Sequence, residues 1–155
     1  MNILFVCSAN ISRSFLAEML LKHEMETLKL DKISVRSAGI HAIPGNAPDL
    51  QMVDYLTKKG IPAEEHESKQ ITEQDVDWAD LIFVMEKDHQ SIIEGMWPQS
   101  KEKVELLGKF VSGGSVTDDI VDPYHRSPYH YRLAQSQITM SVQSLVKQVI
   151  LDQNA

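Results

Sequence analysis

One segment decides the fold of this chain: Ile3-Leu4-Phe5-Val6-Cys7-Ser8-Ala9-Asn10-Ile11-Ser12-Arg13-Ser14. It opens with four consecutive apolar residues, a run typical of a strand buried on both faces of a parallel sheet. Apolar residues then recur among charged ones, and this pattern predicts a helix over residues 14–28. A buried strand that passes through a short loop into a helix is the first unit of an α/β fold.

The same alternation continues along the chain. It predicts strands at 33–38, 81–85 and 104–107, and helices at 48–59, at 86–96 and from Tyr129 onward. In the second helix we expect an inward stripe of Leu50, Val53 and Leu56, with Gly60 ending the helix. The stretch 112–115 (Ser-Gly-Gly-Ser) is predicted to be a surface loop, and the last helix is expected to bury Ile138, Val142, Leu145, Val146, Val149 and Ile150.

These elements predict an α/β fold: a four-stranded parallel sheet flanked by helices on both faces, in a single domain over residues 1–155. A length of 155 residues also favours one domain. Ligands of such sheets bind at the carboxyl ends of the strands. We therefore expect the site just after Val6, Ala38, Met85 and Leu107.

Composition excludes several classes of protein. The 15 basic and 22 acidic side chains give a net charge of −7, which argues against broad binding to nucleic acid. Cys7 is the only cysteine, so an intramolecular disulfide and a cysteine-based zinc site are excluded. The apolar run at the start is too short for a signal peptide or a transmembrane helix, so we expect no membrane insertion and a cytoplasmic protein.

The loop after the first strand has the composition of an anion site. Backbone N–H groups that converge at a helix N-terminus bind anions, and the same positive field favours the thiolate of Cys7. Arg13 offers a planar fork that matches phosphate oxygens, and Ser14 can donate its hydroxyl to the thiolate. Asn10 suits a left-handed or hydrogen-bonded turn position. The opposing interpretation is an inert cysteine that ends a buried strand.

A thiolate that attacks a phosphate ester needs a proton donor for the leaving oxygen. The segment Asp122-Pro123-Tyr124 offers a carboxylate on a loop stiffened by proline, beside an aromatic side chain. Such a loop suits an aryl phosphate. For an isolated Asp-Pro pair, the alternative is that it merely begins a turn.

Together, the Val6–Ser14 and Asp122–Tyr124 segments resemble the V-C-x-x-N-x-x-R-S signature and the D-P-Y acid loop of low-molecular-weight protein tyrosine phosphatases. The resemblance covers essentially the whole chain and is greatest to the bacterial branch. It implies that Cys7 is the nucleophile, Arg13 the phosphate binder and Asp122 the general acid and then base. Its other implied site residues are Ser8, Ala9, Asn10, Ile11, Ser12, Ser14 and Tyr124 around the substrate, with Ser37 and His66 supporting Asn10.

The resemblance also implies partners. The substrate would be a phosphotyrosine protein, such as an autophosphorylated tyrosine kinase that governs capsule or exopolysaccharide export. Phosphate, sulfate or vanadate would inhibit at the loop, and no metal or other cofactor is expected. Two positions depart from the family: Phe15 stands where a proline is frequent, which leaves the start of the first helix open, and Ser12 stands where many members have a second cysteine.

Other interpretations remain at this point. An arsenate reductase of the same fold would need further cysteines for its disulfide relay, and a phosphate-binding module without activity would need no acid. Tyr124, Tyr129 and Tyr131 cluster around the acid loop. They could be targets of regulatory phosphorylation, although we favour a role in walling the cleft or capping the last helix.

Overall fold

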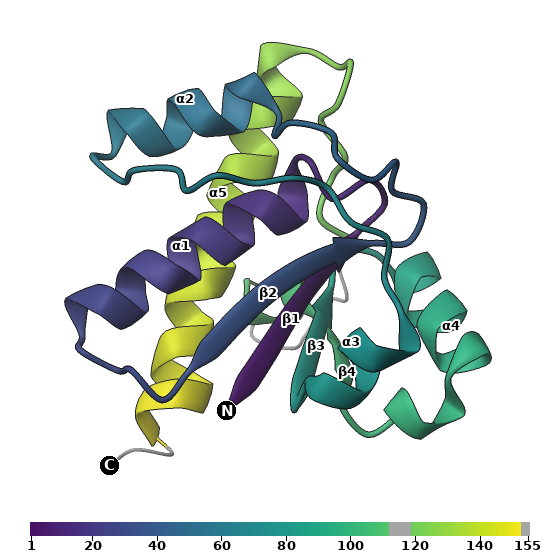
Figure 1. Cartoon of the computed structure of the whole chain (residues 1–155). Coiled ribbons are helices and arrows are strands. Elements are labelled where there is room, and N and C mark those ends of the chain that lie inside the picture. The colour runs from purple at the N-terminus through teal and green to yellow at the C-terminus, as the bar shows by residue number, and fades with distance from the viewer. Residues whose placement is uncertain (112–118, 153–155) are drawn as a thin grey trace.

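Four parallel strands form the central sheet in the order β2-β1-β3-β4 (Figure 1). The computed structural model describes residues 1–111 and 119–152. The strands are β1 (Asn2–Cys7), β2 (Ser34–Gly39), β3 (Leu81–Val84) and β4 (Val104–Leu106). The single α/β domain expected from the sequence is confirmed, and each strand ends within one residue of its predicted limit.

Strand β1 is buried on both faces, as its apolar run predicts. Ile3, Phe5 and Cys7 pack into one cluster of core residues, whereas Leu4 and Val6 pack into a second cluster. Successive side chains of a strand point to opposite faces, so a strand between two helical layers needs apolar residues at every position.

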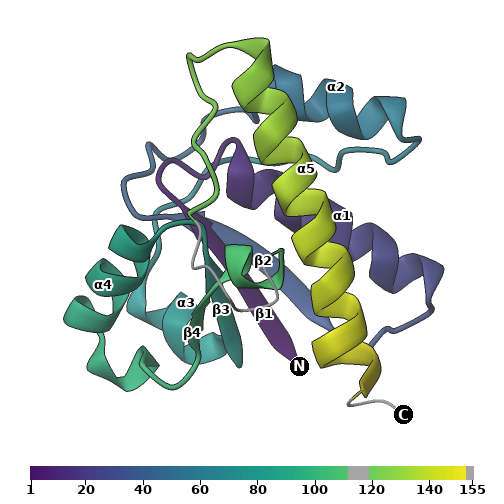
Figure 2. The same ribbon diagram turned by 180° about the vertical axis from the view of Figure 1, so that it is seen from behind.

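Helices cover both faces of the sheet (Figures 1 and 2). The first face carries α1 (Arg13–Thr27) and α5 (Pro128–Leu145), with α2 (Leu50–Lys58) packed against both helices. The other face carries α3 (Glu73–Trp78) and α4 (Lys87–Met96). Three short turns complete the fold: η1 (Pro98–Ser100), η2 (Leu107–Phe110) and η3 (Val146–Leu151), the last continuing α5 as a π-helix.

The predicted inward stripe of α2 is wrong at Leu50, whose side chain is 80% exposed. The helix begins at this residue rather than at 48, because Asp49 caps it by accepting the Gln51 N–H at 3.0 Å. Met52 and Leu56 are the buried residues, and Val53 is half-buried. Residues four positions apart share a helix face, whereas residues two positions apart lie on nearly opposite faces.

The expected end of α2 is confirmed. Gly60 has a φ of +75°, the Gly60 N–H bonds to the Thr57 carbonyl at 3.0 Å, and the Ile61 N–H bonds to the Leu56 carbonyl at 2.9 Å. This pair of hydrogen bonds is the Schellman arrangement, which requires a left-handed residue and therefore favours glycine.

Helix α3 is absent from the sequence prediction. It has only six residues, too few to show a periodicity, but it carries a capping box in which Thr72 and Asp75 bond to each other's backbone N–H groups. The three-residue spacing of Thr72 and Asp75 was the signal in the sequence that could have predicted the start of this helix. The predicted core of the last helix is confirmed, with Val149 half-buried and the other five residues buried.

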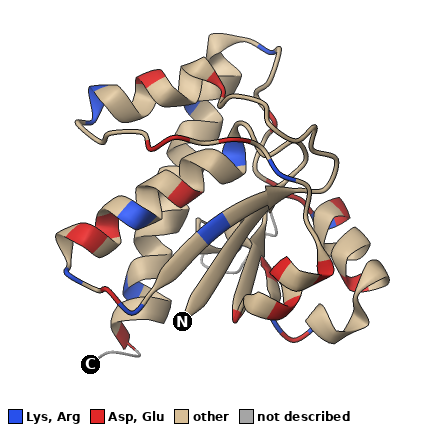
Figure 3. Cartoon of the chain, in the orientation of Figure 1, with Lys and Arg blue, Asp and Glu red and all other residues tan. Residues whose placement is uncertain are grey.

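The predicted surface loop at 112–115 lies outside the described residues. In the ranges 1–111 and 119–152, no helix is both long and apolar enough to span a membrane. Figure 3 shows acidic side chains on α1, α3, α4 and the segment between α2 and α3, interspersed with basic ones. Positive charge for an anion must therefore be supplied locally.

Candidate active site

The loop between β1 and α1 lies at a reversal of the strand order. From β1 the chain first forms β2 on one side and later β3 on the other. Loops that leave neighbouring parallel strands in opposite directions open a crevice at their carboxyl ends, where α/β proteins bind ligands. Residues 8–12, here called the phosphate loop, occupy this position.

Asn10 determines the shape of the phosphate loop. Its φ is +58°, in the left-handed region, and its side chain is fully buried. Its Nδ2 donates to Ser14 Oγ and to Ser37 Oγ, both at 2.9 Å, and its Oδ1 accepts the Lys69 N–H at 3.0 Å. The left-handed turn position expected from the sequence is therefore observed, as is the contact with Ser37.

His66 supports the same loop from outside. Its Nε2 lies 2.7 Å from the Asn10 carbonyl oxygen, and its ring packs on Phe15 with centroids 4.8 Å apart. Phe15 is fully buried in the first turn of α1, which begins at Arg13. The residue that departs from the family pattern thus packs against the histidine that holds the loop.

Gly39, the last residue of β2, allows the phosphate loop to approach closely. A Cβ at this position would lie 2.7 Å from Ser8 O and 3.0 Å from both Ala9 C and Asn10 N. All three are backbone atoms, so rotation of a side chain cannot relieve the clash.

We expect Gly39→Ala to displace the phosphate loop, lower the free energy of unfolding by about 1–3 kcal/mol and weaken phosphate binding. Urea unfolding and calorimetry with inorganic phosphate measure the two effects. Gly95→Ala is the matched control, because a Cβ on this helical glycine meets nothing within 4 Å. Equal behaviour of the two variants would contradict the close approach.

Cys7 is 3% exposed and lines a small pocket together with residues of this loop. Ser14 Oγ lies 3.0 Å from Cys7 Sγ, so its hydroxyl can donate to a thiolate. Within the described part of the chain, the backbone N–H groups of residues 8–12 have no protein acceptor. Buried N–H groups are almost always paired, so these donors are available to an anion.

Arg13 is 1% exposed and is held by three oxygens. Its Nη1 donates to the Ile120 carbonyl at 2.7 Å, and its Nη2 lies 2.8 Å from Glu86 Oε2 and 3.6 Å from Asp122 Oδ2. A guanidinium has more N–H groups than these contacts use. Arg13 is therefore fixed in place with donors left for phosphate oxygens.

A small pocket of about 40 Å³ brings the expected residues together. Asp122 enters it from the loop before α5; its side chain is 51% exposed and its Oδ1 accepts the Tyr124 N–H at 3.2 Å. Tyr124 is 45% exposed and its ring contacts that of His125 in a tilted arrangement, with centroids 4.0 Å apart. The lining residues are Cys7, Ser8, Ala9, Ile11, Ser12, Arg13, Asp122 and Tyr124.

Comparison with known families agrees with this geometry. The model of the family described as "Low molecular weight phosphotyrosine protein phosphatase" matches residues 2–155. The chain belongs to this family. It is therefore a low molecular weight protein phosphatase, and the resemblance noted in the sequence is confirmed.

Relatives within the family differ in the phosphoamino acid that their names state. A protein-arginine-phosphatase of Geobacillus stearothermophilus is 34% identical over 152 residues, covering 97% of each chain. The low molecular weight protein-tyrosine-phosphatase Etp of Escherichia coli is 30% identical over 126 residues, covering 81% of this chain and 79% of Etp. The solved structure of Vibrio vulnificus Wzb in complex with benzylphosphonate superposes with a TM-score of 0.84 at 29% identity, covering 96% and 98% of the two chains.

The sequence alone did not identify several residues that surround the phosphatase site. Glu86 lies two residues after the end of β3, just after Met85, where the site was expected, so its position was the available signal. Glu18 accepts the Ser37 hydroxyl and pairs with Lys22 at 2.8 Å. The signal for Glu18 is weak, because α1 carries several glutamates.

Asp49 and Tyr131 also support the phosphate loop, a role that the sequence did not predict. Asp49 Oδ2 accepts the hydroxyls of Ser12 and Tyr131, each at 2.6 Å, and the Asp49 N–H donates to the Ile11 carbonyl at 2.8 Å. Burial and the Asp49 carboxylate raise the pKa of Tyr131, so its phenol stays protonated and remains a donor. Ser12 is thus tied to α2 and α5.

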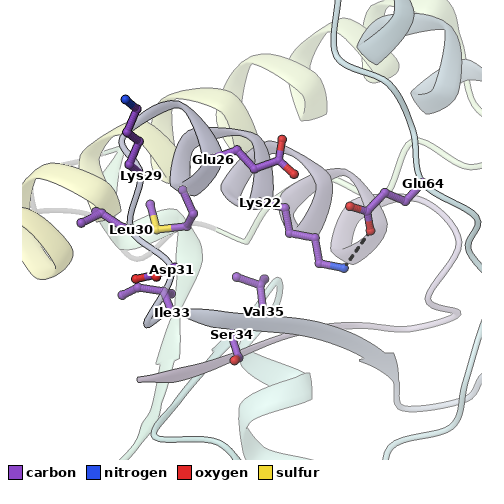
Figure 4. Close-up of a pocket in the computed structure, with 10 residues that line it drawn as sticks. Lys22, Glu26, Lys29, Leu30, Asp31, Ile33, Ser34, Val35 and Glu64 are labelled. Atoms are coloured by element: carbon purple, nitrogen blue, oxygen red, sulfur yellow. Dashed lines mark hydrogen bonds and ion pairs between the residues drawn. The ribbon is translucent and has the colours of Figure 1, made fainter.

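A larger hollow of about 510 Å³ lies away from this site, between the end of α1 and β2 (Figure 4). It is lined by apolar residues such as Val35 and Leu30 and by charged residues such as Lys22 and Glu64. None of the expected site residues lines it. In the ranges that the structure describes, no group of three His, Cys, Asp or Glu side chains is placed to hold a metal ion.

Proposed function

We propose that this phosphatase hydrolyses phosphotyrosine in proteins through a phosphocysteine intermediate. The observation that carries the proposal is the lining of the small pocket, which includes Ala9, Ile11 and Tyr124. Apolar and aromatic side chains around a small pocket favour binding of a phenyl ring. The chemistry in this pocket rests on Cys7 and Arg13.

Phosphoarginine fits this pocket less well. Its guanidinium group keeps several N–H donors that need acceptors when they leave water. Among the pocket-lining residues in the described chain, the only carboxylate is Asp122. The proposed mechanism requires Asp122 as the proton donor, so it cannot also serve as a permanent acceptor.

In the first step, the Cys7 thiolate attacks phosphorus in line with the tyrosyl oxygen. The S–P bond forms, the P–O bond to the phenol breaks, and Asp122 in its acid form protonates the leaving oxygen. Arg13 and the free N–H groups of the phosphate loop stabilise the charge on the remaining phosphoryl oxygens.

In the second step, the Asp122 carboxylate takes a proton from a water molecule that attacks the phosphocysteine. The S–P bond breaks, inorganic phosphate forms and the thiolate is restored. The Cys7–Ser14 contact at 3.0 Å stabilises the thiolate both as nucleophile and as leaving group.

Specificity is tested with two peptides that differ only in carrying phosphotyrosine or phosphoarginine at the same position. We expect kcat/KM to favour phosphotyrosine by about 100-fold or more, since buried unpaired donors are costly. Ile11→Thr keeps the β-branch but places a hydroxyl in the pocket lining, and it should lower kcat/KM for phosphotyrosine by about tenfold. Faster hydrolysis of the phosphoarginine peptide by the parent protein would refute the tyrosine assignment.

The physiological substrate is a further part of the proposal. We infer an autophosphorylated tyrosine kinase that controls capsule or exopolysaccharide production, acting in the cytoplasm, where a lone thiol stays reduced. This inference rests on the resemblance to the bacterial branch. Phosphoproteomics on proteins retained by an Asp122→Ala trapping variant tests it, and retention of unrelated phosphoproteins only would count against it.

Two other functions are disfavoured by specific observations. Cys7 is the only cysteine of the 155 residues, so the chain has no second thiol for the relay of an arsenate reductase. A binding module without activity has no need for a general acid. Asp122 nevertheless lies 3.6 Å from Arg13 and lines the same small pocket as Cys7.

A further inference from the structure

His89 is a buried histidine beside the phosphate loop to which the mechanism above gives no part. It lies in the first turn of α4, on the opposite face of the sheet from α1, and is 4% exposed. Its Nε2 lies 3.0 Å from Ser8 Oγ and 3.4 Å from Glu86 Oε2. Its Nδ1 is buried and has no hydrogen-bond partner among the described residues.

These surroundings select one tautomer of the neutral ring. With its proton on Nδ1, the ring would bury an N–H without an acceptor and turn the Nε2 lone pair toward the Glu86 carboxylate, even if the Ser8 hydroxyl donated to Nε2. With its proton on Nε2, the N–H faces two oxygens and only a lone pair is left unpartnered. Buried orphan N–H groups are rarer than under-used acceptors, so the Nε2–H form is favoured.

The lowered pKa of His89 also favours the neutral ring. Burial lowers the pKa of His89, and the positive charge of Arg13 acts in the same direction, against the carboxylates of Glu86, Asp119 and Asp88. A neutral imidazole has a single N–H. The nitrogen that carries this proton therefore determines whether Ser8 Oγ accepts a hydrogen bond from His89 or donates one to it.

Ser8 lines the small pocket with Cys7. A free serine hydroxyl rotates among several directions and can act either as donor or as acceptor. When His89 Nε2–H occupies a lone pair of Ser8 Oγ, the hydroxyl hydrogen must point away from His89, and the anion pocket that Ser8 lines is then open to it.

We propose that His89 is a positioning residue for phosphate binding, which holds the Ser8 hydroxyl so that its O–H donates to a phosphoryl oxygen above Cys7. The same Nε2–H faces Glu86 Oε2, which lies 2.8 Å from Arg13 Nη2. The inference rests on the proposed function only in placing a phosphoryl group at Cys7.

Two substitutions at this position separate a donor role from a packing role. In His89→Gln the amide nitrogen can reach the place of Nε2, whereas in His89→Asn it lies near the place of Nδ1. Calorimetry with inorganic phosphate should show binding by the Gln variant within about threefold of the parent, and binding by the Asn variant about tenfold weaker. Ser8→Ala should also bind about tenfold more weakly, and adding His89→Asn to it should cost nothing more.

Equal phosphate binding by the Gln and Asn variants, or additive losses in the double variant, would overturn the proposal. Nitrogen-15 NMR of the parent protein shows which ring nitrogen of His89 carries the proton, and it requires no substitution. We expect a protonated Nε2, and a protonated Nδ1 would refute the donor role. Phosphate binding without hydrolysis of phosphotyrosine would defeat the proposed function while leaving this inference intact.

Discussion

Cys7→Ser is expected to abolish turnover of phosphotyrosine, with a loss of about 10⁴-fold or more in kcat, because a serine hydroxyl in this pocket is far less ionised than a thiol. Binding of inorganic phosphate should persist within about tenfold. The free N–H groups of the phosphate loop and the donors of Arg13 are left in place by this change. Single-turnover assays and calorimetry measure the two quantities.

The persistence of binding is what makes the Cys7→Ser result informative. A variant that loses turnover and phosphate binding together would indicate a collapsed loop rather than a missing nucleophile. Thermal unfolding distinguishes these cases, and the conservative exchange of sulfur for oxygen beside Ser14 should leave the midpoint nearly unchanged. Parental turnover by the variant would exclude Cys7 as nucleophile.

Asp122→Ala is expected to reduce kcat for phosphotyrosine by about 10²–10³-fold, because the phenoxide leaving group then departs without a proton. The loss should be smaller for p-nitrophenyl phosphate, whose leaving group needs less protonation. Arg13 keeps its ion pair with Glu86 at 2.8 Å, so removal of the half-exposed Asp122 carboxylate leaves no buried charge unpaired. Steady-state rates across phenols of different pKa measure the effect as a steeper dependence on the leaving group.

A matched surface carboxylate provides the control for Asp122. Asp54 on α2 is 58% exposed, against 51% for Asp122, and it pairs only with Lys58 among the described residues. Asp54→Ala should hydrolyse phosphotyrosine at the parental rate. If Asp122→Ala does the same, the general acid must be sought elsewhere.

The parts of the site that were predicted from residues alone lie on one contiguous segment. The buried strand, the loop and the helix that follow each other from Ile3 to Ser14 are governed by local rules of periodicity, turn chemistry and helix ends. The conformation of Asn10 was predicted for the same reason. Asp122 was chosen from its proline and tyrosine neighbours and from the family resemblance, since carboxylates are too numerous for composition to select one.

The residues that were missed act across long separations. Glu86 reaches Arg13, Asp49 reaches Ser12 over 37 positions, and the Ile120 carbonyl reaches Arg13 over 107. No period or spacing encodes such contacts, because they exist only once the strands are in register. The error at Leu50 has a similar origin, since the start of α2 is fixed by a cap that is itself tied to distant hydroxyls.

The Asp49 carboxylate links three parts of the chain that are made at different times during synthesis. It holds Ser12 near the N-terminus, begins α2 in the middle and receives Tyr131 from the last helix. A nascent or truncated chain that lacks α5 would leave this carboxylate without one of its partners. We therefore expect full activity only after the C-terminal helix docks, because until then Asp49 lacks the Tyr131 hydroxyl that helps to hold it beside Ser12.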